Sequence, residues 1–267
     1  MINFEQYLLE RTGSAVAQPQ PKRKVKDREE LQRIIASKQS LKDLDISAIR
    51  DMSSLFKDNS DFNISEVETW DFSEVEVMDE MFWGCKELES IKLNNLSKVV
   101  SMQGCFSWCP KLKSVELLGT HNLKLMVNTF AYSTKLKNVY IPQMESVTDM
   151  YKCFHMCGLL QSMNINSNKL YRLWDCFRGC ANLKEVTISD TTFLNNAEHC
   201  FHGCVKLNKV VIPFPKNAQA LGYMFYDCKK LDQSFSSWDL KGIKHESMFD
   251  KATIILKADG YLPANYK

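Results

Sequence analysis

A phenylalanine recurs along most of the chain at an almost constant interval. The spacings between successive members are 26, 24, 24, 24, 23, 24, 24 and 24 residues. The recurring residues are Phe56, Phe82, Phe106, Phe130, Phe154, Phe177, Phe201, Phe225 and Phe249. A fixed period of this length is typical of a chain made of stacked copies of one supersecondary unit. The interval therefore predicts a repeat protein.

Each phenylalanine has the same kinds of neighbour. An apolar residue stands four positions before it, a small or soft residue one before, and usually a cysteine three after, as in Met102, Cys105, Phe106 and Cys109. These offsets match the spacing of residues on one face of a helix. The pattern predicts a short helical turn around each phenylalanine, with that face in the core.

A leucine follows six residues after most of these phenylalanines and leads into an alternating apolar pair. The pairs are Ile91/Leu93, Val115/Leu117, Val139/Ile141, Met163/Ile165, Val186/Ile188 and Val210/Ile212. Alternation of β-favouring residues predicts a short, half-buried strand. We therefore expect an α/β solenoid of about nine to ten short strand-plus-helical-turn coils, roughly 45 Å long at about 4.8 Å per coil.

Two motifs resemble known repeat families. The stretch Leu136-Lys-Asn-Val-Tyr-Ile-Pro142, followed by Val147-Thr-Asp-Met150 and Cys153-Phe-His-Met-Cys157, resembles the BspA-like leucine-rich repeat of bacterial surface proteins. The stretch Trp70-Asp-Phe-Ser-Glu-Val75, echoed by Phe235-Ser-Ser-Trp-Asp239, is similar to the mycoplasma-lipoprotein-type repeat. The resemblance implies a leucine-rich-repeat-like solenoid whose usual work is to bind other proteins.

The N-terminal residues depart from the repeat. Residues 1–11 form a short amphipathic segment whose Phe4, Tyr7 and Leu8 could dock on the solenoid or on a partner. The spacing of Phe4, Tyr7, Leu8 and Glu10 is also similar to the leader of some tailed-phage proteins. Residues 12–26 contain two prolines and a basic run, and we expect a flexible linker there.

The remaining boundaries follow from capping signals and from the repeat itself. Asp27 and Glu30 have the spacing of a capping box, so residues 27–46 are expected to form an N-terminal capping helix and a degenerate first coil. We assign residues 47–256 to the solenoid and residues 257–267 to a C-terminal cap.

The cysteines allow two interpretations. Cys105/Cys109, Cys153/Cys157, Cys176/Cys180 and Cys200/Cys204 are each four residues apart, and His155, His199 and His202 lie near them. Thiolates and imidazoles at such spacing can hold zinc. However, Met81, Thr129 and Met224 replace cysteine at one offset and Ser133 at the other. The pattern therefore favours a ladder of buried thiols over a metal site or disulfides, and we expect neither metal nor cofactor.

The sequence lacks the common signatures of catalysis. It contains no Gly-rich phosphate loop, no G-x-S-x-G elbow and no HExxH pattern, so we expect a protein without enzymatic activity. The formal net charge is +2, and residues 22–33 alone contribute +3, which disfavours a dedicated nucleic-acid domain. The alternative is nucleic-acid binding through the basic run Lys22, Arg23, Lys24 and Lys26.

Side chains beside the core phenylalanines are the best candidates for binding. Trp, Tyr and Arg are enriched at interface hot spots, and a row of them across adjacent coils would form an extended stripe. The candidates are Trp83, Trp108, Tyr132, Tyr151, His155, Met156, Trp174, Arg178, His202, Tyr223 and Tyr226. The alternative surface is the outer face of the strands, with Lys92, Glu116, Tyr140, Asn164, Thr187 and Val211.

These observations favour a non-enzymatic scaffold that binds a protein through the aromatic stripe or the strand face. The alternatives are a phage-encoded virion or accessory protein targeted by residues 1–11, and a host-facing surface adhesin of the kind that the family resemblance implies. No apolar stretch reaches the roughly 20 residues of a membrane span, and the N-terminus lacks the features of a signal peptide. We therefore expect a monomer or weak homo-oligomer in the cytoplasm of a bacterial cell or phage-infected host, with the virion as an alternative location.

Overall fold

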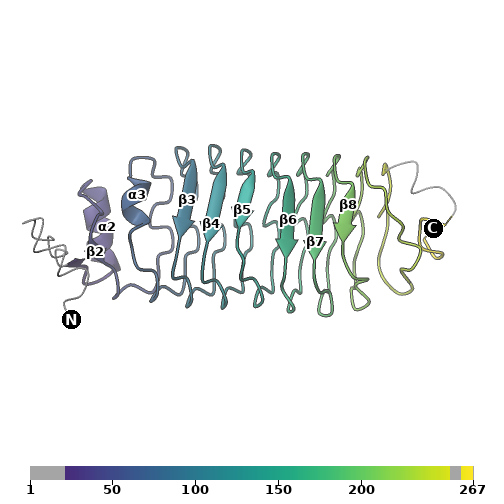
Figure 1. The fold of residues 1–267 in the computed structure, drawn as a ribbon, viewed down its shortest axis with the longest axis horizontal. Coiled ribbons are helices and arrows are strands. Elements are labelled where there is room, and N and C mark those ends of the chain that lie inside the picture. Colours follow the sequence, from purple (N-terminus) through teal and green to yellow (C-terminus); the bar gives the residue numbers. More distant parts are fainter. Residues whose placement is uncertain (1–21, 253–259, 267) are drawn as a thin grey trace, which may run out of the picture.

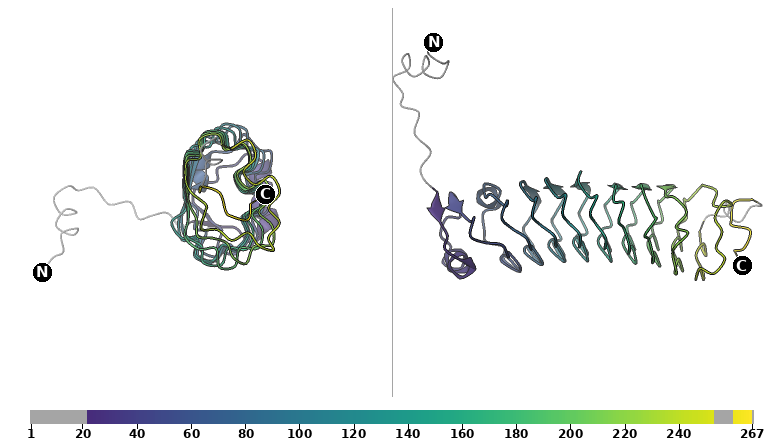
Figure 2. Two further views of the ribbon diagram at one scale, coloured as in Figure 1. Left: turned by 90° about the vertical axis from the view of Figure 1, so that its right-hand side faces the viewer. Right: turned by 90° about the horizontal axis from the view of Figure 1, so that it is seen from below.

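The computed structural model describes residues 22–252 and 260–266. In this structure the chain winds into an elongated stack of coils, with the purple N-terminal coils at one end and the yellow C-terminal coils at the other (Figure 1). Seen nearly along the stack, the coils superimpose as an oval ring (Figure 2). The predicted solenoid is therefore confirmed.

Short parallel strands form one wall of the solenoid. The first sheet contains β3 (Ser90–Leu93), β4 (Ser114–Leu117) and β5 (Asn138–Tyr140), and the second contains β6 (Ser162–Ile165), β7 (Glu185–Ile188) and β8 (Lys209–Val211). Equivalent residues of successive coils pair, as Val115 does with Val139. Ile91 and Leu93 are buried while Lys92 is exposed, so the predicted strand pattern is confirmed.

The wall that carries the phenylalanines is not helical, and the predicted helical turns are wrong. In every coil the residues two before and two after the phenylalanine have positive φ, as Gly104 (61°) and Trp108 (58°) do around Phe106. Such residues cannot belong to a right-handed helix. Helix content is small, so the α/β label applies only loosely.

Hydrogen bonds between coils replace the expected helix. Alternate N–H groups point to the next coil: Gly104 N donates to Val127 O at 2.8 Å, and Phe106 N donates to Thr129 O at 2.8 Å. The N–H of Cys105, which lies between them, instead closes a turn within its own coil. We call the residues from five before to two after each phenylalanine the turn ladder. Backbone bridges connect its first residues through nine coils, from Asp51 to Lys244, while the sheet is interrupted between β5 and β6.

The turn ladder buries the same side chains that a helix would bury. Met102, Cys105, Phe106 and Cys109 are all fully buried, as the apolar offsets predict. The nine phenylalanine rings stack along the solenoid with centroid distances of 5.2–5.6 Å and interplanar angles of 3–10°. The burial pattern alone therefore cannot distinguish a helix from the turn ladder.

The cysteine three residues after the phenylalanine has a specific partner. Cys109 Sγ donates to Phe82 O of the preceding coil at 3.1 Å, and Ser133 Oγ donates to Phe106 O in the same way at 2.7 Å. The same bond, at 3.0–3.2 Å, is made by Cys85, Cys157, Cys180, Cys204 and Cys228. In the seven coils from Phe82 to Phe225 this position therefore holds a small side chain that donates a hydrogen bond.

The N-terminal end shows that the predicted linker does not reach residue 26. β1 (Arg23–Lys24) pairs in parallel with β2 (Leu44–Asp45), and Val25 is buried. Val25 anchors the basic run, because its N–H donates to Asp45 O at 2.9 Å while the basic side chains stay exposed. Residues 1–21, with the proposed docking side chains Phe4, Tyr7 and Leu8, lie outside the described residues.

Both ends of the stack are covered. The helix expected after Asp27 is present as α2 (Arg28–Ala36), and the Asp27 side chain accepts a hydrogen bond from Glu30 N at 2.8 Å. A single helical turn, α3 (Ile64–Val67), stands where later coils have a strand. At the other end, the Tyr266 ring packs edge-on against Phe249. The proposed division of the whole chain into segments stays a prediction, and no described helix is long and apolar enough to cross a membrane.

The hydrogen bond of Ser133 provides a test of this architecture. Ser133 Oγ also accepts from Cys109 N at 3.2 Å, so Ser133→Ala leaves buried backbone groups without these partners. We expect a loss of about 1–3 kcal/mol in the free energy of unfolding, measured with urea, whereas Ser133→Cys keeps the donor and loses less. The exposed Ser162→Ala is the control, with an expected change within about 0.5 kcal/mol. Equal effects of the two alanine variants would contradict the assigned role of this bond.

Candidate protein-binding site

The outward side chains of the turn ladder form one face of the solenoid, which we call the turn face. One of its two positions with positive φ lies two residues after each phenylalanine. Glycine or aspartate occupies this position in five coils, at Asp58, Gly84, Gly179, Gly203 and Asp227. Three consecutive coils carry bulky apolar or aromatic residues there instead, and the last coil carries Lys251.

These three bulky residues, Trp108, Tyr132 and Met156, form what we call the ridge. Their φ values are 58°, 63° and 61°. The left-handed region disfavours a residue with a side chain by roughly 1–2 kcal/mol, and bulky residues are rare there. Hydrogen bonds to the next coil hold the strained backbone, as when Trp108 N donates to Ala131 O at 2.9 Å.

The ridge is ordered by packing and still open to solvent. The Trp108 and Tyr132 rings stack with centroids 4.3 Å apart, and the His155 ring meets Tyr132 edge-on at 5.1 Å. The next coil has Gly179 beside Met156, where a β-carbon would overlap the Met156 sulfur. Trp108 is 51% exposed and Met156 is 43% exposed. The ridge therefore presents a pre-packed apolar surface.

A groove lies along the N-terminal side of the ridge. Small residues leave space between the large rings, and the lining includes Trp83, Gly104, Ser107, Trp108, Ala131 and Tyr132. Lys57 Nζ lies 4.7 Å from the centroid of the Trp83 ring and pairs with Glu80, another lining residue, at 2.7 Å. An apolar side chain of a partner could enter this groove between Trp83 and the ridge.

A second aromatic group lies two coils beyond the ridge. His202 contacts the Tyr226 ring at 4.6 Å, and His199 stacks on Tyr223 at 4.7 Å. The Nδ1 atoms of the two histidines are 3.0 Å apart. Burial lowers the pKa of His199, His202 and also His155, so these rings are neutral at pH 7.

The predicted stripe is thus divided into separate groups. Trp83, Trp108, Tyr132, His155 and Met156 surround the groove and ridge. Tyr151 and Trp174 form a pair at 5.2 Å, with the Arg172 guanidinium 4.9 Å from the Tyr151 ring. Arg178 is held by Asp175 at 3.2 Å, beside the group of His202, Tyr223 and Tyr226.

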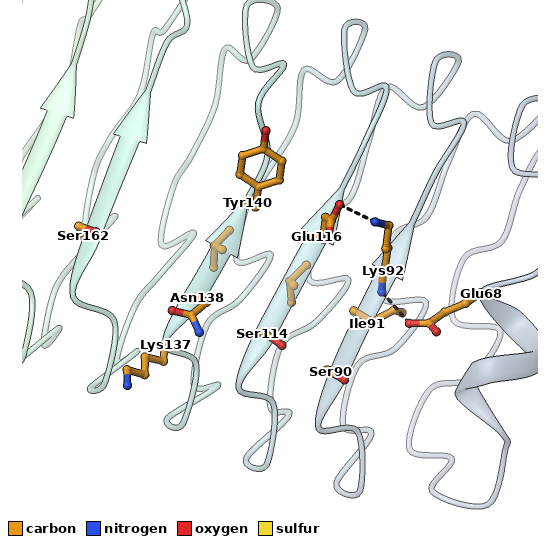
Figure 3. Close-up of a pocket in the computed structure, with 12 residues that line it drawn as sticks. Glu68, Ser90, Ile91, Lys92, Ser114, Glu116, Lys137, Asn138, Tyr140 and Ser162 are labelled. Carbon is orange, nitrogen blue, oxygen red and sulfur yellow. Dashed lines mark hydrogen bonds and ion pairs between the residues drawn. The ribbon is translucent and has the colours of Figure 1, made fainter.

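The strand face differs in chemistry from the turn face. Figure 3 shows Lys92, Glu116 and Tyr140 on adjacent strands of a shallow hollow. Lys92 Nζ pairs with Glu116 at 2.8 Å, and Lys92 N donates to Glu68 at 2.7 Å. Tyr140 is 58% exposed, and farther along the face Asn164 and Val211 are also exposed while Thr187 is half-buried. The polar groups of this hollow are partly satisfied by one another.

The cysteine side chains are part of the core. All ten cysteines are buried, and burial raises the pKa of each of them. The thiols three residues after phenylalanine point at backbone carbonyls, while His155, His199 and His202 lie half-buried on the turn face. In the part of the chain that the structure describes, no group of three or more His, Cys, Asp or Glu side chains is placed to hold a metal ion.

The special character of the ridge was missed at the level of sequence. The residue types predict Trp108 and Tyr132 as binding residues, but they do not reveal the positive φ of either residue. The available signal was glycine at the same offset in three other coils, Gly84, Gly179 and Gly203, because glycine at a fixed position of a repeat marks positive φ.

Comparisons with known proteins agree with the repeat architecture. Residues 150–257 match the model described as the BspA type leucine rich repeat region, in 6 copies, and residues 23–116 match the model described as Mycoplasma protein of unknown function, DUF285. The resemblance to BspA-like repeats is thereby confirmed. A search of curated proteins gives no match.

Several solved structures are similar to the chain. A leucine-rich repeat protein of T. pallidum is 24% identical with a TM-score of 0.48, over 59% of this chain and 72% of that one. A leucine rich cell surface protein from Faecalibacterium prausnitzii is 18% identical with a TM-score of 0.37, over 60% and 42%. A leucine-rich repeat protein from Eubacterium ventriosum is 15% identical with a TM-score of 0.36, over 78% and 82%.

The buried thiols predict an alkaline limit to stability. Burial raises the pKa of Cys109 to about 12, whereas an unfolded chain exposes thiols with a pKa of about 8.5. The native state therefore keeps protons that the unfolded state loses, so the stabilising contribution is complete below about pH 8 and declines as the pH rises further. We expect the free energy of unfolding in urea, with reductant, to fall by about 1 kcal/mol per buried thiol over the first pH unit above 8.5.

A variant with fewer thiols is the control for this alkaline effect. Cys109→Ser combined with Cys157→Ser keeps a hydrogen-bond donor at both positions and removes two titrating groups. The decline with pH should be shallower in this variant than in the unaltered chain. An unchanged slope would mean that other groups cause the alkaline loss of stability.

Proposed function

The chain carries BspA-type leucine-rich repeats over residues 150–257, and from this premise we propose that it is a non-enzymatic scaffold that binds another protein through its turn face. Repeat solenoids offer extended regular surfaces for partners. The raised pKa values of the buried thiols support a role without covalent catalysis, because the thiolate is the reactive form.

The strained ridge is the observation that carries this proposal. Trp108 and Tyr132 occupy a position that five other coils fill with glycine or aspartate, so a requirement of the fold does not account for them. Backbone strain retained in adjacent repeats is typical of a functional surface. Trp and Tyr are also enriched among interface residues that contribute most to binding.

The surroundings of the ridge support binding to a folded protein surface. Trp108 projects beside a groove whose other wall is Trp83, so the site offers both a protruding ring and a hollow. Shape complementarity of this kind characterises the centre of protein interfaces. The strand face is the weaker candidate, because its Lys92 and Glu116 already pair with each other. The cytoplasmic location, the virion role and the adhesin role stay predictions from sequence.

Glycine substitution separates binding from stability at the ridge. Trp108→Gly with Tyr132→Gly removes both rings and relieves the left-handed strain, so we expect a free energy of unfolding within about 1 kcal/mol of the original value or higher. We expect the same variant to weaken partner binding by at least about 2 kcal/mol, roughly 30-fold. The measurement is urea unfolding beside titration of a partner captured by tagged full-length protein.

The control variant removes an exposed ring from the strand face instead of the turn face. Tyr140→Ser lies on the strand face, where Tyr140 is 58% exposed, and it should leave partner affinity within about twofold. Binding that survives the double glycine change and is lost with Tyr140→Ser would move the interface to the strand face and overturn the proposal.

A further inference from the structure

The charges of this nearly neutral chain are separated onto different surfaces. The formal net charge is only +2. Nevertheless, lysines gather at the positions five and seven residues after the phenylalanines, just before the strands begin. We call this set the lysine edge, and its members are Lys111, Lys113, Lys135, Lys137, Lys184, Lys206 and Lys230.

The backbone joins the lysine edge into two rows, because the sheet is interrupted between β5 and β6 and the coil of Phe154 carries Leu159 and Gln161 at these offsets. Lys137 N donates to Lys113 O at 3.0 Å, and in later coils Lys184 N donates to Gln161 O at 2.8 Å and Asn208 N to Lys184 O at 2.9 Å. Residues joined in this way lie on neighbouring strands, about 4.8 Å apart. Figure 3 shows Lys137 at the start of β5, next to Asn138.

Most of this positive charge is not neutralised by the protein. At the N-terminal end of the lysine edge, Glu87 pairs with Lys111 at 2.5 Å and Glu89 pairs with Lys113 at 2.7 Å. Beyond that point, within residues 22–252 and 260–266, no ion pair is formed by Lys135, Lys137, Lys184, Lys206 or Lys230. These five side chains are exposed and repel one another.

The turn face has the opposite character. Within the described chain its turn ladders carry ten carboxylates against six lysine and arginine side chains, a formal balance of −4. An anionic ligand is therefore repelled from the turn face and attracted to the lysine edge. Such separation steers an approaching anion to one place on the surface.

We propose that the lysine edge binds an extended acidic polypeptide segment, at a site separate from the ridge. Lysine provides point charges without the fork of arginine that fits phosphate in a bidentate manner. Beside the lysine edge, the strand starts present Ser114, Asn138 and Ser162, which can donate hydrogen bonds to carboxylate and main-chain oxygens, and the starts of β7 and β8 present Glu185 and Lys209.

The aromatic content of the strand face favours a peptide over single-stranded nucleic acid. Nucleic-acid grooves combine positive charge with several rings on which successive bases stack. Among the outward strand residues from β3 to β8, Tyr140 is the one aromatic side chain. A succession of bases would therefore lack partners along the lysine edge.

The test is fluorescence anisotropy with a labelled oligoglutamate at low ionic strength. The edge variant carries Lys135→Gln, Lys137→Gln, Lys184→Gln and Lys206→Gln. The matched control removes the same charge from exposed loop lysines through Lys124→Gln, Lys169→Gln, Lys216→Gln and Lys241→Gln. We expect the edge variant to lose at least about tenfold in affinity and the control to change by less than about twofold.

Three results would overturn the proposal. The first is an absence of oligoglutamate binding by the unaltered chain, and the second is an equal loss in the edge and control variants. The third is tighter, edge-dependent binding of an oligothymidylate of equal charge, which would make the lysine edge a nucleic-acid site. The Trp108→Gly, Tyr132→Gly variant should bind oligoglutamate normally, so failure here is distinguishable from failure of the proposed turn-face function.

Discussion

Hydrogen bonds between the turn ladders of successive coils are the interaction on which the rest of the structure depends. Each ladder sends alternate N–H groups along the stack, as Phe106 N does to Thr129 O. This geometry holds the coils near the spacing of paired strands, which is about 4.8 Å. The phenylalanine rings therefore stack at 5.2–5.6 Å, and Cys109 Sγ can reach the carbonyl of Phe82. The core is a consequence of the backbone register.

The ladder also explains which parts of the fold are predictable from sequence. Apolar offsets identify Met102, Phe106 and the strand residues, because buried positions recur in the sequence as apolar residues at a fixed interval. The backbone conformation around each phenylalanine is harder to predict, because a helix and a run of turns can bury side chains at the same offsets. Positive φ is indicated by the glycines at positions such as Gly84 and Gly104 and by the aspartates at the same offsets, such as Asp58. The pairing of β1 was hidden because a basic, proline-flanked stretch has the composition of a linker, while its anchor is one residue, Val25.

The same distinction applies to the candidate site. Aromatic residue types point to Trp108 and Tyr132, and the structure places both on the ridge, with Trp108 exposed and Tyr132 half-buried. Sequence does not reveal that Tyr151 and Trp174 pair with each other, or that Arg178 is held by Asp175. Such grouping depends on which outward offsets meet across coils, and that follows from the turn geometry. The lysine edge was also invisible in the net charge, because carboxylates elsewhere balance it.

The ridge is distinguished by backbone strain and the lysine edge by positive charge, and the same solenoid carries both surfaces. A strained Trp108 can persist because hydrogen bonds to the next coil fix its backbone. The lysine edge can persist because exposed lysines repel one another only weakly in water. The ridge belongs to the turn ladder and the lysine edge to the start of the strand wall, so one rigid stack holds them at a fixed separation. A partner with both an apolar contact and an acidic segment would gain affinity from this fixed geometry, since the second contact forms within an existing complex.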